Sequence, residues 1–359
     1  KMDAIVTDMR MPGMDGASFL AEARRIAPDA CRLILSGQAD EAMALRALPV
    51  AHQFLHKPCD RDQIVTAVDR KCAVRDILMD ADLRRLVVET KSLPSPAAAR
   101  RQLHAALSNP LFGGAEVSAI IERDAALSAK FLQLANSAFF SLPHVVLDVR
   151  EAIRMLGLPT IEHVLQATDV FETLPEQAEL QGQDLLQFKR RTFAVANLAS
   201  RIAEQCQLDA CVARTAGMLH DIGVLVFAKS RPEAAEIAWT RAVSEGRTFV
   251  ELEEAEIGAT HAQLGASLLG VWGLPESIVK AIETHHSPHS ETLELDGVLH
   301  IAGVLVAESM VRAGSSPEVA VCHGTLNPDW LQRVGRLSDL SEWQKLADQV
   351  FEASQRVIQ

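Results

Sequence analysis

The sequence predicts a multidomain chain, with a doubly wound α/β domain at the amino terminus and an all-α domain after it. Three observations lead to this prediction. The first sixty residues alternate strand-like and helix-like runs, which is typical of a parallel sheet. From residue 91 on, amphipathic helical stretches follow one another with no convincing alternating strand. The chain has 359 residues, which is too many for one ordinary core.

Three short apolar runs form the predicted sheet. They cover residues 3–8, 31–37 and 52–58, and each is bounded by Asp, Gly or Pro. Helical patterns over residues 15–28 and 38–49 connect them.

Reactive side chains stand where these three runs end. A doubly wound sheet brings the carboxyl ends of its strands to one edge, so we expect Asp8, Ser36 and Lys57 to meet there. This set suits acyl-phosphate chemistry, with the carboxylate as nucleophile and the hydroxyl and ammonium binding phosphoryl oxygens. Each residue alone could be a polar strand cap, but all three in this order favour the chemistry.

Three motifs in this region resemble a response-regulator receiver domain. They are "VTDMRMPGMDG" (6–16), "LILSG" (33–37) and "FLHKP" (54–58). The resemblance covers residues 1 to about 75. It implies Asp8 as the phosphorylation site, Ser36 as the switch hydroxyl, Phe54 as the switch aromatic and Lys57 as the conserved lysine. It also implies a sensor histidine kinase as partner.

A receiver has a strand, a helix and a second strand ahead of its phosphoacceptor strand. None of these three elements precedes the predicted phosphoacceptor strand, residues 3–8, in this sequence. We expect that roughly fifty residues are missing from this sequence, the size of a strand–helix–strand unit. The resemblance places the acidic pair that binds Mg²⁺ at the end of the first of these strands. If the protein truly lacked that pair, phosphorylation at Asp8 would be impaired.

A helical connector over residues 76–90 is predicted to join the receiver to the all-α domain. Residues 59–93 contain neither Gly nor Pro, and their apolar residues are spaced mostly as in a helix. One continuous helix and two shorter helices meeting near Asp80–Asp82 are both compatible with this pattern.

The all-α domain is predicted over residues 91–312, with Ser95 as the N-cap of its first helix and Pro96 at the first helical position. Further helices are expected over 115–123, 126–136, 148–156, 159–173, 184–205, 210–228, 248–256, 261–271, 275–285 and 291–312. An apolar stripe in a helical extension, residues 313–359, is expected to pack on this domain. A partner-binding helix is the alternative.

One region gathers four of the twelve histidines and an aspartate, namely His220, Asp221, His261, His285 and His286. Imidazoles and a carboxylate from separate helices are suitable ligands for Zn, Mn or Fe. Adjacent helical residues diverge by about 100°, so His285 and His286 can share a metal only near a helix end. The alternative is structural, with a buried His220 donating to Asp221 to fix helix packing.

The order of motifs around these residues resembles the HDOD domain, an output-domain relative of the HD and HD-GYP phosphohydrolases. The motifs are "GMLHDIG" (217–223), "HAQLG" (261–265) and "VWGLPESIVKAIETHH" (271–286), with "DAALSAKFLQLANSAFF" (124–140) and "AIRMLGL" (152–158) upstream. The resemblance spans about residues 90–312. It implies an all-α fold and frequent pairing with receiver domains.

Three positions depart from the pattern of the active HD enzymes. Arg191 stands where a ligand histidine would be, or Thr192 if the register shifts by one residue. Gly303 replaces a ligand aspartate, and Val224 replaces a lysine. An arginine is always protonated and offers no lone pair to a metal. We therefore expect either no metal or a weakly held divalent metal here, and an HDOD domain that is not an enzyme.

The sequence thus predicts a response regulator in which phosphorylation at Asp8 controls a non-catalytic HDOD domain. This domain would bind a protein or a nucleotide-type ligand. The alternative is a metal-dependent phosphohydrolase acting on a nucleotide or cyclic dinucleotide. The net charge of −12 disfavours nucleic acid as a partner. The chain has no run of eighteen apolar residues, and its six scattered cysteines suggest the cytosol. A homodimer is left open.

Overall fold

A computed structural model describes the chain in ranges separated by gaps. The described residues are 4–27, 30–36, 47, 50–62, 64–65, 68–69, 77–90, 92–136, 145–166, 172–174, 179–180, 183–315, 319 and 324–358. They form two compact units. The first unit takes residues 1–121, 129–174 and 267–276, and the second unit takes residues 122–128, 175–266 and 277–359.

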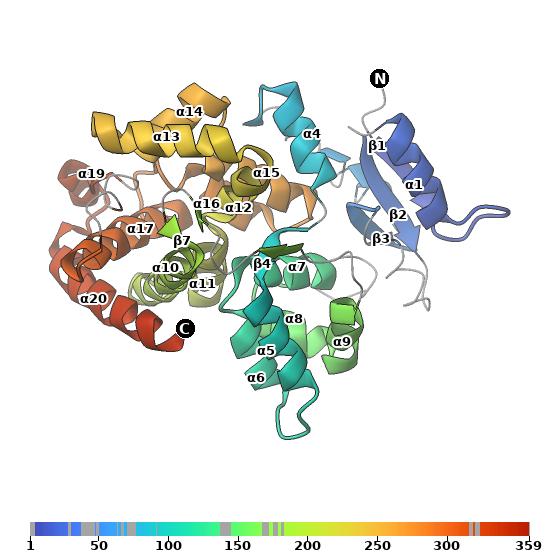
Figure 1. Ribbon diagram of the computed structural model, residues 1–359, viewed down its shortest axis with the longest axis horizontal. Helices are drawn as coiled ribbons and strands as arrows, with labels where there is room; N and C mark the ends of the chain where they lie inside the picture. Colours follow the sequence, from blue (N-terminus) through green and yellow to red (C-terminus); the bar gives the residue numbers. More distant parts are fainter. Residues whose placement is uncertain are drawn as a thin grey trace. The chain divides into compact units, whose positions relative to one another are not determined.

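The first unit contains the predicted parallel sheet. Strands β1 (Ala4–Asp8), β2 (Cys31–Ser36) and β3 (Gln53–His56) pair in parallel in that order. Helix α1 (Gly16–Ile26) lies beside them in Figure 1, and its buried residue Leu20 shares a core cluster with residues of all three strands. The predicted α/β class is confirmed.

The chain signals the start of α1 locally. The carboxylate of Asp15 accepts a hydrogen bond from the Ser18 amide at 2.7 Å, which satisfies one of the free N–H groups of the first turn. The helix predicted over residues 38–49 lies outside the described residues, apart from Ala47.

The connector is not one continuous helix. Helix α4 (Ala81–Glu89) starts after Asp80, whose carboxylate accepts from the Leu83 amide at 2.9 Å, and Leu78–Asp80 are not helical. The two-helix alternative therefore describes this point correctly, because Asp80 caps a new helix there. Residue 76 of the connector and residues 70–75 before it lie outside the described residues.

The first unit also holds most of the amino-terminal half of the helical region. Its helices are α5 (Ala97–Leu107), α6 (Gly114–Ile121), α7 (Ala125–Ala135, its first four residues in the second unit), α8 (Val149–Leu156) and α9 (Leu158–Gln166). The predicted cap at Ser95 was wrong. Pro94–Pro96 form a short strand, β4, which pairs in parallel with β5 (Glu172–Leu174), and Ser95 is fully buried in it. The two prolines explain this, since a residue before proline favours extended backbone.

The second unit is almost entirely helical. Its helices are α10 (Leu185–Gln205), α11 (Ala210–Leu219), α12 (Ile222–Ser230), α13 (Pro232–Glu245), α14 (Phe249–Ile257), α15 (His261–Val271, whose last five residues belong to the first unit), α16 (Glu276–Thr284), α17 (Leu295–Arg312), α19 (Pro328–Arg333) and α20 (Leu340–Val357). A short 3₁₀ helix (Leu337–Asp339) precedes α20, and a small hairpin of β6 (Glu179–Leu180) and β7 (Gln183–Asp184) precedes α10. These short strands were not predicted, but the all-α class of this part of the chain was.

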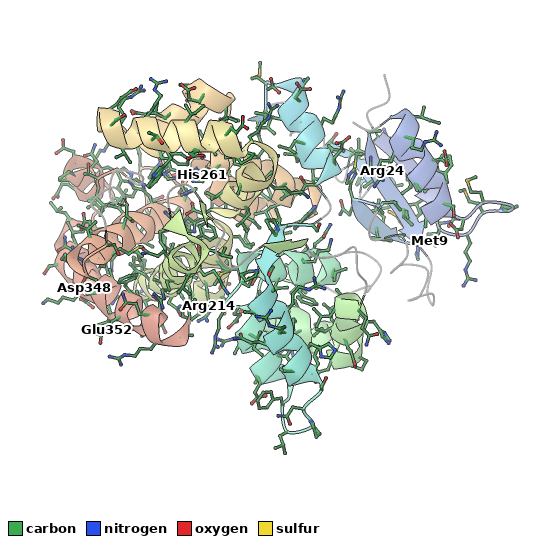
Figure 2. The ribbon with its side chains drawn as sticks, viewed as in Figure 1. Met9, Arg24, Arg214, His261, Asp348 and Glu352 are labelled. Carbon is green, nitrogen blue, oxygen red and sulfur yellow. The ribbon has the colours of Figure 1, made fainter. Side chains whose placement is uncertain are left out.

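The carboxyl-terminal stripe packs on the helical region as predicted. Trp343 of α20 is fully buried, and its indole nitrogen donates to Gln205 of α10 at 2.7 Å. Asp348, which Figure 2 labels on the same helix, accepts from Arg312 of α17 at 2.8 Å. Helix α20 therefore closes one side of α10 and α17 (Figure 1).

One stretch, Ala210–Ser230, is long and apolar enough to cross a membrane on length and composition alone. It was predicted as a single helix over residues 210–228. The structure divides it into α11 and α12 at His220 and Asp221, and 83% of its most apolar window is buried inside the protein. A core helix of a globular domain has the same properties.

Candidate functional site

The predicted phosphorylation residue lies at the carboxyl edge of the sheet. Lys57 Nζ donates to Asp8 Oδ2, and both side chains are about 40% exposed, at 42% and 39%. The hydrogen bond from Lys57 lowers the pKa of Asp8 below its ordinary value. The structure therefore brings these two predicted residues together as an accessible ion pair.

The other two predicted switch residues have different surroundings. Ser36 ends β2, the central strand, at the same edge of the sheet. Phe54 is 2% exposed and belongs to the core cluster beside α1. Their roles in switching stay predictions. Among the described residues, no group of three or more metal-ligating side chains includes Asp8.

The second candidate site is built around a break between two helices. Helix α11 ends at Leu219, His220 caps it, and Asp221 precedes α12. His220 Nδ1 donates to the Gly217 carbonyl at 2.7 Å, which turns Nε2 toward Asp221 Oδ2 at 3.1 Å. Both side chains are buried, at 0% and 1% exposure.

Two glycines bring Asp221 close to the start of α15. A Cβ atom on Gly223 would lie 2.0 Å from the His261 carbonyl oxygen, and one on Gly265 would lie 3.0 Å from the Gly223 nitrogen. Only residues without a side chain allow α12 and α15 to approach this closely. The glycines of the "HDIG" and "HAQLG" motifs thus position Asp221 against His261.

His261, labelled in Figure 2, lies between two buried carboxylates. Its Nδ1 is 2.7 Å from Glu253 Oε2, and its Nε2 is 3.2 Å from Asp221 Oδ1. Burial opposes a charge on the ring, but Glu253 and Asp221 outweigh it and raise the pKa of His261 to about 10. His261 is therefore a buried imidazolium at neutral pH.

His285 and His286 directly follow the end of α16 at Thr284. Two adjacent histidines can contribute to one site only near a helix end, and this position meets that condition. His285 Nδ1 donates to the Ile282 carbonyl at 2.6 Å, and its Nε2 lies 3.8 Å from Asp221 Oδ1. His286 Nε2 lies 2.8 Å from His261 Nε2. Burial holds the pKa of His285 well below its ordinary value, so this ring is neutral.

Arg191 of α10 completes the cluster. Its guanidinium donates to Asp221 Oδ2 as a buried ion pair, with side-chain exposures of 5% and 1%. Burial favours the neutral carboxyl, but His220 and Arg191 hold the pKa of Asp221 well below its ordinary value. Val224 and Gly303 are buried in α12 and α17. Of the two registers, the structure agrees with the one that places Arg191 at the ligand position, because the Arg191 side chain contacts Asp221.

Glu253 is the site residue that the sequence did not reveal. It lies in "VELEEAEI" (250–257), where four of eight residues are glutamates. Only Glu253 and Leu252 of this stretch are buried. Helical spacing from Phe249 identifies the buried face, because Phe249, Leu252 and Glu253 follow the i, i+3, i+4 pattern. That pattern could have singled out Glu253.

The cluster can be tested as a metal site. The candidate ligand atoms of Asp221, His261, His285 and His286 all lie within 4.8 Å of one another. The donor types suit a divalent transition metal, and the Nδ1 hydrogen bonds of His261 and His285 resemble those that orient metal ligands. The set fits one ion at most, since Gly303 supplies no second carboxylate and Arg191 already binds Asp221. It does not fit a two-metal centre.

The comparisons with known proteins agree with this architecture. The family model of the HDOD domain matches residues 93–288, more than half of the chain. The chain belongs to the HDOD family. The model of the response regulator receiver domain matches residues 1–69 of this HDOD protein. The predicted combination of a receiver and an HDOD output domain is therefore confirmed.

Relatives of this HDOD protein share parts of it. A protein of Treponema pallidum (strain Nichols) is 28% identical over 194 residues, which are 53% of this chain and 37% of that protein. The C4-dicarboxylate transport transcriptional regulatory protein DctD of Pseudomonas aeruginosa is 30% identical over 134 residues, which are 37% of this chain and 27% of DctD. The HDOD protein thus spans little more than a third of one relative and about a quarter of the other.

A solved structure shares the fold. The MmoQ response regulator from Methylococcus capsulatus is 23% identical and aligns over 70% of this HDOD protein and 98% of MmoQ, with a TM-score of 0.55. This likeness shows a common fold between the two proteins.

Proposed function

We propose that phosphorylation at Asp8 controls a non-catalytic HDOD domain, which acts by binding a protein or a small ligand. A receiver domain in general takes its phosphoryl group from a sensor histidine kinase. The accessible Asp8–Lys57 pair supports this role, since the Lys57 ammonium that now binds the carboxylate can bind a phosphoryl oxygen once Asp8 is phosphorylated. That movement would alter the receiver at the edge where Ser36 also lies.

The ion pair between Arg191 and Asp221 is the observation that supports a non-catalytic output domain. A hydrolytic centre of this type needs Asp221 to be free for metal ions, whereas here a guanidinium binds it. A cation near a metal ion is also unfavourable, by about 4 kcal/mol per pair of unit charges at 4 Å and an effective dielectric constant of 20.

The buried carboxylates of the cluster also have cationic partners without a metal. Two buried carboxylates, Asp221 and Glu253, face two cations, Arg191 and the His261 imidazolium. Buried charges persist when they are paired and hydrogen-bonded, as these are. A divalent ion would add an uncompensated charge unless His261 lost its proton. These residues therefore suit a structural network that holds four helices, α10, α12, α14 and α15, together.

A phosphohydrolase is the second candidate, and one observation favours it. His285 Nε2 is buried and has no hydrogen-bond partner within the part of the chain that the structure describes. It points to the region of Asp221 Oδ1, where a single ion held by Asp221, His261, His285 and His286 would satisfy it. Such an ion would supply Lewis acidity or an activated water.

Metal content and hydrolysis separate the two candidates. The protein, purified without chelator, is expected to carry well under one Zn, Mn or Fe ion per chain. Elemental mass spectrometry measures this metal content. It should also leave a generic phosphodiester intact with each metal added. Stoichiometric metal in the protein as purified, lost in His285→Ala, would favour the phosphohydrolase.

A further inference from the structure

The second unit contains a cavity of about 540 Å³ beside the buried cluster. It lies among the start of α14, the segment after α16, the helix α17 and α19. His286 lines this cavity and also approaches His261 of the cluster, at 2.8 Å between the Nε2 atoms. The volume is typical of a pocket for a small molecule.

The ionisable side chains that line the cavity carry an excess of hydrogen-bond donors. They are Arg333, His286, His289, His300 and a single acid, Glu251. Glu251 already accepts from Arg247 Nε at 3.3 Å. Arg333 has no carboxylate partner in the described ranges, whereas Arg312 on a neighbouring element has two and Arg336 has one. In a chain with a net charge of −12, this lining favours an anion.

Trp330 adds a rigid wall with an unsatisfied donor. It is 6% exposed, and its Nε1 has no hydrogen-bond partner among the residues with described positions. Its ring is held against Gly297, where a Cβ would lie 3.0 Å from Trp330 Cζ2, and its centroid is 6.0 Å from the centroid of the His300 ring. A buried N–H normally finds an acceptor, which a ligand or a water in the cavity can provide.

We propose that this cavity binds a small organic anion of about mononucleotide size. Arg333 and His289 would bind its phosphate monoester or carboxylate group, and the walls formed by Trp330 and Val250 would contact its ring or carbon frame. The inference rests on the proposed function, because it names the ligand class through which the HDOD domain would respond. His286 would sense the ligand directly, since it links the cavity to His261.

Titration calorimetry on the full chain tests this site with four probes: guanosine monophosphate, guanosine, inorganic phosphate and citrate. An anionic probe is expected to bind, and guanosine monophosphate should bind at least about tenfold more tightly than guanosine. Tighter binding of citrate would identify a carboxylate as the preferred group. No heat from any anion up to millimolar concentration would overturn the proposal.

Two variants with a matched control decide whether the named residues form the site. Arg333→Gln should weaken binding at least about tenfold, and Trp330→Phe, which keeps the ring and removes the N–H, should weaken it severalfold. Arg356→Gln removes an exposed arginine of α20 and should bind like the wild type. Binding that is unchanged in Arg333→Gln would reject this cavity as the site.

The same samples separate this inference from the proposed function. Chromatography of the nucleotide after incubation reports any hydrolysis. A bound nucleotide that is also hydrolysed would leave the cavity proposal standing and reject the non-catalytic role. Absence of binding would reject the cavity and leave the role of Arg191 untouched.

Discussion

His52 Nε2 lies 2.7 Å from the main-chain oxygen of Val88. His52 directly precedes β3, and Val88 lies in the last turn of α4, so this contact joins the receiver sheet to the connector. The other ring nitrogen, Nδ1, accepts from the Arg32 amide at 2.9 Å, which places the proton on Nε2 and makes it the donor to Val88. The contact is buried, since His52 is 7% exposed and Arg32 is 1% exposed.

Removing the His52 ring should loosen the connector. In His52→Ala the Val88 oxygen and the Arg32 amide both lose a partner, and leaving buried polar groups unsatisfied costs about 1–3 kcal/mol. Amide hydrogen exchange in α4 should become faster, and phosphorylation should no longer change exchange in residues 93–288. His104→Ala, at an exposed histidine of α5, is the control. If the exchange response to phosphorylation survives in His52→Ala, this contact does not transmit the signal.

Phosphorylation should require Asp8. The protein should gain the mass of one phosphoryl group from a small phosphodonor in a Mg²⁺ buffer, and Asp8→Asn should not, because an amide is not a nucleophile for this transfer. Asp15→Asn is the matched control, since Asp15 caps α1. Intact-mass measurement reports the result. Equal labelling of Asp8→Asn and wild type would show that the phosphorylation site is elsewhere.

The close contact between Gly223 and the His261 main chain should exclude any side chain at position 223. Gly223→Ala would place Cβ 2.0 Å from a main-chain oxygen, which cannot move aside like a side chain. We expect the free energy of unfolding to fall by about 3 kcal/mol or more, measured by urea titration. Gly114→Ala, where an added Cβ meets nothing within 4 Å, should change it little. Equal stability of the two variants would show that α12 and α15 do not pack this closely.

Helix positions could be predicted from the sequence where they depend on local periodicity and on the order of motifs. The ranges predicted for α10, α14, α15 and α16 agree with the structure to within about two residues. The sequence could not show that α11 and α12 separate at His220, because apolar residues flank the break on both sides. Nor could it show that Arg191 binds Asp221, since their contact depends on how α10 packs in space.

Lys130 predicts a stability that depends on pH. Burial lowers the pKa of Lys130 to about 7, whereas an unfolded lysine has a pKa of about 10.4. Between these values the unfolded chain binds a proton that the folded chain does not, so the free energy of unfolding should rise with pH from about 7 to about 10.4. The nearby Trp272 ring, 5.2 Å from Nζ, offsets only part of the cost of the charge.

Lys130→Met should remove this pH dependence. At pH 7 the variant should be more stable than wild type, by up to roughly 4 kcal/mol, and the difference should shrink as the pH rises toward 10. Denaturant titrations at several pH values measure it. Lys345→Met, at an exposed lysine of α20, is the control. Parallel pH curves for wild type and Lys130→Met would contradict the assignment of a neutral, buried amine.

The last prediction concerns the residues that replace metal ligands. The double change Arg191→His with Gly303→Asp removes the cation bound to Asp221 and adds two ligand types next to His220, Asp221 and His261. Metal occupancy after purification should rise toward one or more ions per chain, because ligand number and local charge limit binding. Hydrolysis need not appear, since Val224 is unchanged.

Arg191→Met separates the two causes in this experiment. It removes the cation without adding a ligand, and it leaves Asp221 buried without its guanidinium partner, which is expected to cost about 3–5 kcal/mol of stability. If charge alone limits metal binding, Arg191→Met should take up metal as well as the double variant does. If ligands are also needed, only the double variant should. A double variant that folds, by circular dichroism, yet carries no more metal than wild type would show that Arg191 and Gly303 do not limit metal binding at this cluster.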